Sequence, residues 1–252
     1  EKRIAITPEV IKKYNSLGLE IYLPKNYGEH LGIDDEEFVN AGAILENNND
    51  DVINKSNLIL QLNLLEDENL KKLKENQTLI GVLDPFSNIQ KLNDLKERKV
   101  NCFSLELLPR ITRAQAMDIL SSQANLAGYK SVVDSFSYFK KAIPMMMTAA
   151  GTISAAKVLV VGAGVAGLQA IATAKRMGAI VFATDVRIAS KEQVESLGGK
   201  FLVVENSENL ETEGGYAKET TEEFKKKQEE LLKKTLEKID IVICTALIPG
   251  KK

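Results

Sequence analysis

The chain has 252 residues, of which 33 are Lys or Arg and 35 are Asp or Glu, so its formal net charge is -2. Its 44% hydrophobic and 27% charged residues indicate a globular chain with one large or two ordinary domains. The lack of a basic surplus argues against a nucleic-acid-binding protein. Two cysteines and a single histidine, His30, are too few for a disulfide framework or a Cys/His metal site, so no metal is expected.

In the first half of the chain, short apolar runs alternate with segments of helical pattern. This alternation is typical of α/β proteins with parallel sheets. A helix is predicted over residues 8–17, because Thr7 stands at the capping position and Pro8 in the first turn. A shorter helix is predicted over residues 34–41. The predicted strands are residues 20–23, 58–62, 79–83 and 100–105.

The segment 109–130 predicts a helix lined with short polar side chains. We expect the helix to begin near Arg113, because Thr112 and Gln115 have the spacing of a capping box. Asp118 is the only charged residue between Arg113 and Lys130. A polar stripe with a single charged residue, on a mostly buried helix, favours the wall of a polar cleft, with structural polar packing as the alternative. The stripe consists of Gln115, Asp118, Ser121, Ser122, Asn125 and Tyr129.

The second half continues the alternation of strands and helices. Residues 158–174 are nearly all apolar or small, but this run is shorter than the ~20 residues of a bilayer-spanning helix and contains three glycines. We therefore expect a strand, a turn and a helix there. The predicted strands are residues 157–161, 179–184, 201–204 and 239–245, and the predicted helices are 165–177, 191–196 and 221–238.

A glycine-rich turn separates the first of these strands from its helix. The sequence VLVVGAGVAG places Gly162, Gly164 and Gly167 in G-x-G-x-x-G spacing, which is the arrangement that brings a pyrophosphate to a helix N-terminus in dinucleotide-binding folds. The next strand leads to Asp185, where an acid accepts ribose hydroxyls and repels a 2′-phosphate. The pattern predicts NAD(H) rather than NADP(H). The alternatives are glycines that serve packing alone, and an Arg187 that stabilises a 2′-phosphate.

Six segments carry a more specific resemblance. In order along the chain, they resemble the NAD(H)-binding domain I of proton-translocating NAD(P) transhydrogenases. The resemblance implies two Rossmann-like domains with mainly parallel sheets, with NAD(H) in the cleft between them. It also implies a homodimer, located at a bacterial inner membrane or an organelle membrane, that exchanges hydride with NADP(H) on a separate domain III, coupled to proton movement through membrane domain II. The segments are PRITRAQAMDILSSQANLAGYK (109–130), PMMMTAAGT (144–152), VVGAGVAGLQAIATAKRMGA (160–179), DVR (185–187), GGYAKE (214–219) and ALIPGK (246–251).

The resemblance also implies roles for individual residues. Arg110, Asp118 and Ser121 would hold the nicotinamide, and Gln115 would reach toward the NADP(H) side. Tyr216 would belong to a loop that closes over the bound nucleotide. The three methionines at 145–147 match the family, although a methionine run taken alone predicts a flexible filler of the core. The implied nucleotide-binding residues are Gly162, Gly164, Val165, Ala166, Gly167, Asp185, Val186, Arg187, Tyr216, Thr245, Ala246 and Leu247.

We expect an N-terminal α/β domain over residues 1–122 and an NAD(H)-binding Rossmann domain over residues 123–252. The second domain is expected to be cut short, because the chain stops just after a strand that another crossover should follow.

Alanine dehydrogenase is the main alternative, because that family resembles both lobes. Its reaction moves protons as well as hydride, and the family uses a lysine and a histidine in the first lobe. Residues 60–63 (LQLN) and 83–86 (LDPF) contain neither here, and His30 lies elsewhere. Hydride exchange between two nicotinamides needs no general acid or base at the reacting carbons, so it tolerates this absence. A non-catalytic NAD-sensing module is the third possibility, but it has no evident use for residues 110–121.

Overall fold

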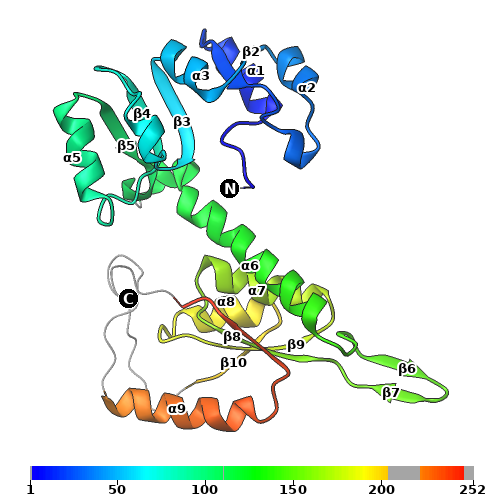
Figure 1. The fold of residues 1–252 in the computed structure, drawn as a ribbon. Helices are drawn as coiled ribbons and strands as arrows, with labels where there is room; N and C mark the ends of the chain where they lie inside the picture. The colour runs from blue at the N-terminus through cyan, green and yellow to red at the C-terminus, as the bar shows by residue number, and fades with distance from the viewer. Residues whose placement is uncertain (1, 110, 204–221, 247–252) are drawn as a thin grey trace. The chain divides into compact units, whose positions relative to one another are not determined.

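The computed structural model describes residues 2–109, 111–203 and 222–246. It divides into two compact units, Glu1–Asp118 and Ile119–Lys252 (Figure 1). The described strands in both units are mainly parallel and alternate with helices, which confirms the predicted α/β class with mainly parallel sheets.

The described part of the first unit has two parallel sheets. Strands β1 (Ile21–Pro24) and β2 (Ala43–Glu46) form one, and β3 (Leu58–Asn63), β4 (Thr78–Val82) and β5 (Asn101–Ser104) form the other in that order. Each sheet has its own apolar core, because the helices around it turn their buried side chains onto that sheet. The cores centre on Ile11, Leu23 and Phe38 for the first sheet and on Leu79, Leu83 and Leu95 for the second.

The first unit confirms the two predicted N-terminal helices. Helix α1 (Pro8–Ser16) has Thr7 at its N-cap, where the Thr7 carbonyl rather than its side chain accepts the first hydrogen bonds. At the start of α2 (Asp35–Asn40), the Asp34 N–H donates to Glu37 Oε1 over 3.3 Å. The other helices of this unit are α3 (Asn49–Lys55), α4 (Asp67–Leu70), α5 (Ile89–Glu97) and the 3₁₀ helices η1 (Glu29–Leu31), η2 (Leu105–Leu107) and η3 (Thr112–Met117).

The helix predicted to begin near Arg113 begins six residues later. Thr112–Met117 forms the 3₁₀ helix η3, and Asp118 follows with ψ of 85°, which leaves the helical region before α6 (Ile119–Tyr138) starts. Gln115 and Asp118 therefore do not share an α-helical face with Ser121. The prediction of a mostly buried helix is also wrong, because the buried residues of α6 are Gly128, Val132 and Phe136, whereas Leu120 and Leu126 are exposed.

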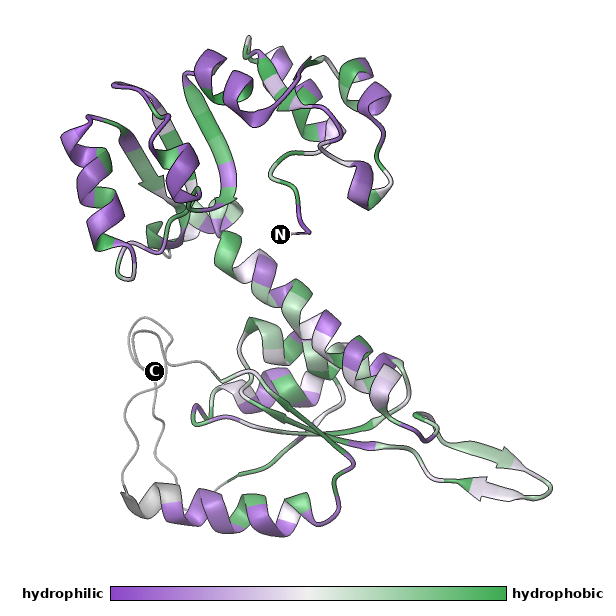
Figure 2. Ribbon diagram, in the orientation of Figure 1, coloured by the Kyte–Doolittle hydropathy of each residue, from purple (hydrophilic) through white to green (hydrophobic). Residues whose placement is uncertain are grey.

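The second unit is built on a parallel sheet in the order β10-β9-β8-β11. The strands are β8 (Lys157–Val161), β9 (Ile180–Thr184), β10 (Lys200–Phe201) and β11 (Ile241–Cys244), and the helices that follow β8, β9 and β10 are α7 (Val165–Arg176), α8 (Ser190–Ser196) and α9 (Glu222–Leu236). Counted along the chain, this order is third, second, first and fourth, as in the Rossmann fold. Figure 2 shows β8 and β9 mainly in the hydrophobic colour, whereas the described part of α9 is mainly in the hydrophilic colour.

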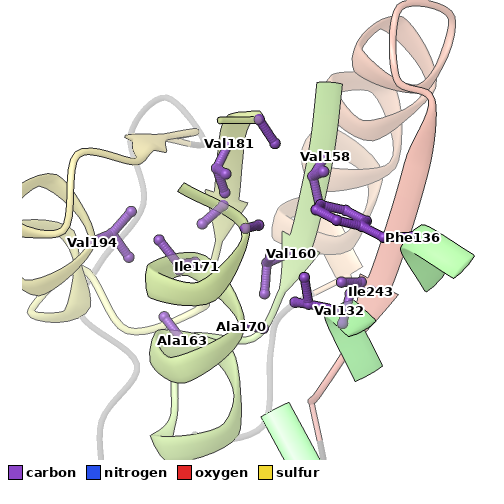
Figure 3. Packing of buried hydrophobic residues seen from close by; sticks show 13 residues of the cluster. Val132, Phe136, Val158, Val160, Ala163, Ala170, Ile171, Val181, Val194 and Ile243 are labelled. Carbon is purple, nitrogen blue, oxygen red and sulfur yellow. The ribbon is translucent and has the colours of Figure 1, made fainter. Parts of the chain in front are cut away.

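The core of the second unit lies against the central strand β8. Val158 and Val160 are fully buried, and Ile171 of α7 is fully buried beside them (Figure 3). Val132 and Phe136 bring the C-terminal half of α6 onto the same core. The sheet and the two helices therefore form one packed body within this unit.

The methionine run forms an exposed hairpin. Strands β6 (Met146–Thr148) and β7 (Gly151–Ile153) pair antiparallel, and all six residues are exposed. The prediction that the methionines fill the core is wrong, since the hairpin extends away from the sheet of its own unit (Figure 1). Residues 158–174 form β8, the glycine turn and most of α7 as predicted. Within the described ranges, no helix has the length and apolar character needed to cross a membrane.

Candidate functional site

The glycine turn lies where the direction of the sheet's connections reverses. From the central strand β8, the chain continues to β9 on one side and later returns to β11 on the other. In open parallel sheets, ligands bind at such a switch point, beyond the carboxyl ends of the strands. Residues 162–164 connect the carboxyl end of β8 to the start of α7 and therefore occupy this position.

The three motif glycines meet three different requirements. Gly162 has φ of +96°, and a Cβ there would lie 2.8 Å from the backbone nitrogen of Ala246. A Cβ on Gly167 would collide with the carbonyl oxygen of Gly162. A Cβ on Gly164, by contrast, would have no atom within 4 Å beyond its chain neighbours. Packing thus requires the first and third glycines, whereas the second leaves open space beside the turn, as the dinucleotide-binding arrangement requires.

The first turn of α7 offers hydrogen-bond donors to that space. Gly164 is the N-cap, and its carbonyl accepts from Leu168 over 2.8 Å. The N–H groups of Val165, Ala166 and Gly167 have no carbonyl partner inside the helix, because helical bonds begin only one turn later. Together with the positive end of the helix dipole, these donors suit an anionic pyrophosphate.

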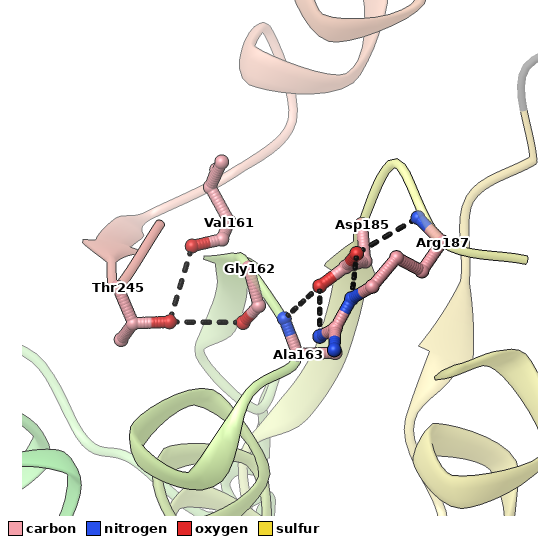
Figure 4. Close-up of polar contacts among 6 residues, drawn as sticks. All are labelled: Val161, Gly162, Ala163, Asp185, Arg187 and Thr245. Carbon is pink, nitrogen blue, oxygen red and sulfur yellow. Dashed lines mark hydrogen bonds and ion pairs between the residues drawn. The ribbon is translucent and has the colours of Figure 1, made fainter. Parts of the chain in front are cut away.

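Asp185, directly after β9, fastens the turn from one side. Its Oδ2 accepts from the N–H of Ala163 over 2.7 Å, and its Oδ1 accepts from the N–H of Arg187 over 2.8 Å (Figure 4). The Arg187 guanidinium adds bonds of 2.9 Å from Nε to Oδ1 and 3.0 Å from Nη2 to Oδ2. Burial acts to raise the pKa of the Asp185 carboxyl, but these hydrogen bonds outweigh it and hold the pKa below its ordinary value.

Thr245, directly after β11, fastens the turn from the other side. Its hydroxyl lies 2.9 Å from the carbonyl oxygen of Gly162, to which it donates, and 3.3 Å from that of Val161 (Figure 4). The Ala163 N–H that binds Asp185 was absent from the predicted residue set. The sequence could have indicated Ala163, because this residue lies between the first two glycines of the motif, where backbone groups make the contacts.

Helix α6 packs directly against the first turn of α7, which follows the glycine turn. A Cβ at Gly128 would collide with the backbone carbonyl oxygen of Ala166, so the two helix backbones are in contact there. Three residues earlier, Asn125 Nδ2 lies 3.2 Å from Gln169 Oε1 on α7. These two contacts fix the position of Ser121, two turns before Gly128 on α6, relative to the glycine turn.

The remaining predicted site residues are distributed as follows. Gln115 is exposed on η3 and Asp118 is half-buried after it, both in the first unit, whereas the half-buried Ser121 belongs to the second. Val186 is half-buried beside Asp185, and Ala246 is exposed next to Thr245. Arg110, Tyr216 and Leu247 lie outside the described residues.

The comparison with known proteins covers the whole chain. Two families match, described as the alanine dehydrogenase/PNT N-terminal domain over residues 1–127 and the corresponding C-terminal domain over residues 131–252. The first part of the NAD(P) transhydrogenase alpha subunit from Rhodospirillum rubrum is 50% identical over 100% of this chain and 67% of the relative. The same protein from Rickettsia prowazekii is 46% identical with the same coverage.

The chain belongs to the NAD(P) transhydrogenase alpha-subunit family. A solved transhydrogenase structure from Sinorhizobium meliloti matches with a TM-score of 0.89 and 43% identity, over 100% of this chain and 68% of that one. The chain thus spans about two thirds of these relatives.

The alanine dehydrogenase alternative is weaker on the same measures. The enzyme from Mycolicibacterium smegmatis is 25% identical over 100% of this chain and 63% of its own length. Within the first unit, β3 and the turn after β4 carry no lysine or histidine, as the sequence indicated. His30 is exposed on η1, with its Nε2 2.9 Å from the carbonyl oxygen of Lys2, so it is a surface residue of the transhydrogenase chain.

Proposed function

We propose that this chain is the NAD(H)-binding component of a proton-translocating NAD(P) transhydrogenase. In this proposal it binds NAD(H) and exchanges hydride with NADP(H) held by a separate domain III, and a membrane domain II couples the exchange to proton movement. The observation that carries the proposal is the switch-point turn, where the open space at Gly164 meets the α7 N-terminus beside the Asp185 carboxylate. That combination fits a dinucleotide with free ribose hydroxyls.

The chain's own groups bind and orient in this proposal. The N–H groups of Val165 and Ala166 receive the pyrophosphate, and Asp185 accepts the adenosine ribose hydroxyls. Arg110, Asp118 and Ser121 hold the nicotinamide carboxamide and ring, with Gln115 toward the partner domain and Tyr216 on a closing loop. The remaining nucleotide contacts come from Val186, Thr245, Ala246 and Leu247, and Arg187 lies beside the ribose position through its bonds to Asp185.

The chemistry of the exchange makes modest demands on the protein. Bound NADH supplies the hydride, and no alkoxide or amine forms that a side chain must protonate. Amide, hydroxyl and carboxylate groups such as those of Gln115, Ser121 and Asp118 suit the task, because they orient a carboxamide without acting as acids or bases. The protein therefore accelerates the hydride exchange by orienting the nicotinamide and by excluding water from it.

We also propose that two copies of the chain form a homodimer. Support comes from the β6–β7 hairpin, because a two-stranded hairpin with exposed apolar side chains is marginally stable when water surrounds it. Met147 is 72% exposed and Ile153 is 53% exposed. A homodimer that covers these side chains would remove that cost. The names of the bacterial relatives support the other partners, since each describes one portion of an alpha subunit and hence a component of a larger complex.

A mixing assay tests the proposed function. NADH binding is measured first, and the chain is then mixed with a purified domain III that carries NADP⁺. We expect reduction of NADP⁺ at the expense of NADH, and no turnover of alanine with NAD⁺. Turnover of alanine, or NADH binding without any transfer to domain III, would contradict the proposal.

A further inference from the structure

The carboxylate that the proposed function assigns to the adenosine ribose already has four hydrogen bonds within the protein. Two come from backbone N–H groups, of Ala163 and Arg187, and two come from the Arg187 side chain. Only 7% of the Asp185 side chain and 19% of the Arg187 side chain are exposed. Two carboxylate oxygens offer about four acceptor sites, so the structure uses all of them.

The four hydrogen bonds to Asp185 differ in what must move when each one breaks. The two backbone bonds cannot be lost without moving the glycine turn or the chain after β9, and both of these hold the site together. The Arg187 side-chain bonds can be lost by rotation of one side chain, without any movement of the backbone. A ribose diol, which must donate two hydrogen bonds to the same carboxylate, can therefore take only the positions of Nε and Nη2.

We propose that Arg187 is a specificity-determining residue that covers the Asp185 carboxylate in the free protein and is displaced by the adenosine ribose of NAD(H). This inference rests on the proposed function, because it concerns the same nucleotide site. It assigns to Arg187 a role opposite to that of an ordinary nucleotide contact, since the arginine competes with the ribose of NADH instead of binding it.

The displaced guanidinium stays near the ribose. Its backbone N–H still binds Asp185 Oδ1, so the side chain remains anchored two residues from the carboxylate. A cation at that place partly cancels the repulsion between Asp185 and a 2′-phosphate. Arg187 therefore weakens NADH binding and at the same time limits the discrimination against NADPH that Asp185 alone would provide.

The test measures dissociation constants for NADH and NADPH with the full chain and its Arg187→Ala variant. Direct nicotinamide fluorescence serves as the signal, because the chain contains no tryptophan to interfere. With the competing ion pair removed, we expect NADH to bind about three- to tenfold more tightly. We expect NADPH to bind at least about tenfold more weakly, since the nearby cation is gone.

Two further variants separate charge from hydrogen bonding. Arg187→Gln keeps donors for Asp185 without the charge, so it should weaken NADPH while NADH affinity stays near that of the unaltered chain. Lys191→Ala is the matched control, because it removes an exposed positive charge four residues further along, on α8, without contacting Asp185. Its two affinities should stay within about twofold of the unaltered chain. Thermal unfolding confirms that each variant is folded.

The outcomes distinguish this inference from the function on which it rests. If the unaltered chain binds NADH but Arg187→Ala binds it more weakly, or with an unchanged NADH-to-NADPH ratio, Arg187 is an ordinary contact and only this inference is wrong. If the unaltered chain fails to bind NADH at all, the proposed function and the inference are both overturned.

Discussion

Asp185 fastens the glycine turn through its hydrogen bonds, and the proposed function gives the same carboxylate a role in recognising the ribose. Through Ala163 it ties the end of β9 to the turn after β8, while Thr245 ties the end of β11 to the same turn. The turn is thus held by hydrogen bonds from both neighbouring strands. Backbone donors that are held in place before a ligand binds lower the cost of binding an anion, so this arrangement suits the phosphate-binding role that we propose for the turn.

Replacing Asp185 by Asn tests the recognition function. The variant keeps the size of the side chain but loses the charge and one acceptor, so NADH binding should weaken by ~1.5–3 kcal/mol. Discrimination against NADPH should fall as well. Calorimetric titration with both nucleotides measures the two effects. The control is Asp94→Asn, which removes an exposed carboxylate on α5 in the first unit. Unchanged selectivity in Asp185→Asn would contradict the ribose assignment.

The same carboxylate should make stability depend on pH. Because folding lowers the pKa of Asp185 below its ordinary 3.8, its ionised form contributes stability above that pH, and the contribution is lost as the pH falls through the folded pKa. We expect the difference in unfolding free energy between the unaltered chain and Asp185→Asn to be constant above about pH 5 and to shrink below pH 3.8. Urea unfolding at pH 6 and pH 3 measures it, and a difference that grew in acid would contradict the ion-pair geometry.

The glycine turn could be predicted from the sequence because its determinants are local. Gly162, Gly164 and Gly167 lie within six residues, and the strand and helix on either side are continuous in sequence. The Arg187–Asp185 ion pair was not predicted, although both residues were singled out. Whether an arginine binds a ligand or a neighbouring carboxylate depends on its rotamer, and residue spacing does not determine that.

At the scale of helices and strands, the sequence predicted most parallel strands of both halves well, because short apolar runs between helical patterns identify them. The short elements β2 and α3 were missed, although Asn48 caps α3 by accepting from the N–H of Asp51 over 2.9 Å. The start of α6 was misplaced for a related reason. The capping-box spacing of Thr112 and Gln115 is a local signal, and the same residues instead form a 3₁₀ turn that ends at Asp118.

The contact between α6 and α7 is an element-scale feature with a clear test. Intrinsic helix propensity predicts that Gly128→Ala stabilises α6 by roughly 1 kcal/mol, because glycine is a poor helix former. The structure predicts the opposite sign, since the new Cβ would meet the backbone carbonyl of Ala166, which cannot yield as a side chain does. We expect a destabilisation of about 1–3 kcal/mol and weaker NADH binding.

Chemical unfolding measures this effect, and the neighbouring residue supplies a control. Ala127→Ser changes an exposed position on α6 and should alter the unfolding free energy by less than about 0.5 kcal/mol. A stabilised Gly128→Ala variant would show that the two helices are free to separate, and Ser121 would then have no fixed position relative to the turn.

At the scale of the whole molecule, the exposed β6–β7 hairpin differs from the rest of the second unit, because the described core of that unit does not pack against it. The core of the second unit includes residues of α6, α7, α8 and the sheet, and the described members of that core include none from β6 or β7. The family resemblance predicted a homodimer, whereas the methionine run alone predicted core packing. Sequence could not resolve this, because an apolar side chain looks the same whether its own chain or a second copy covers it.

Met147→Glu tests the homodimer. Met147 is the most exposed methionine of the hairpin, and burying a charge in an apolar interface without a partner is costly, so we expect the dimer to dissociate at least about tenfold more readily. Sedimentation over a range of protein concentrations gives the molecular mass directly. Leu236→Glu is the control, because it places the same charge at an exposed apolar position at the end of α9. An unaltered chain that stays monomeric at every concentration, or a Met147→Glu variant as dimeric as the control, would show that the hairpin does not join two copies.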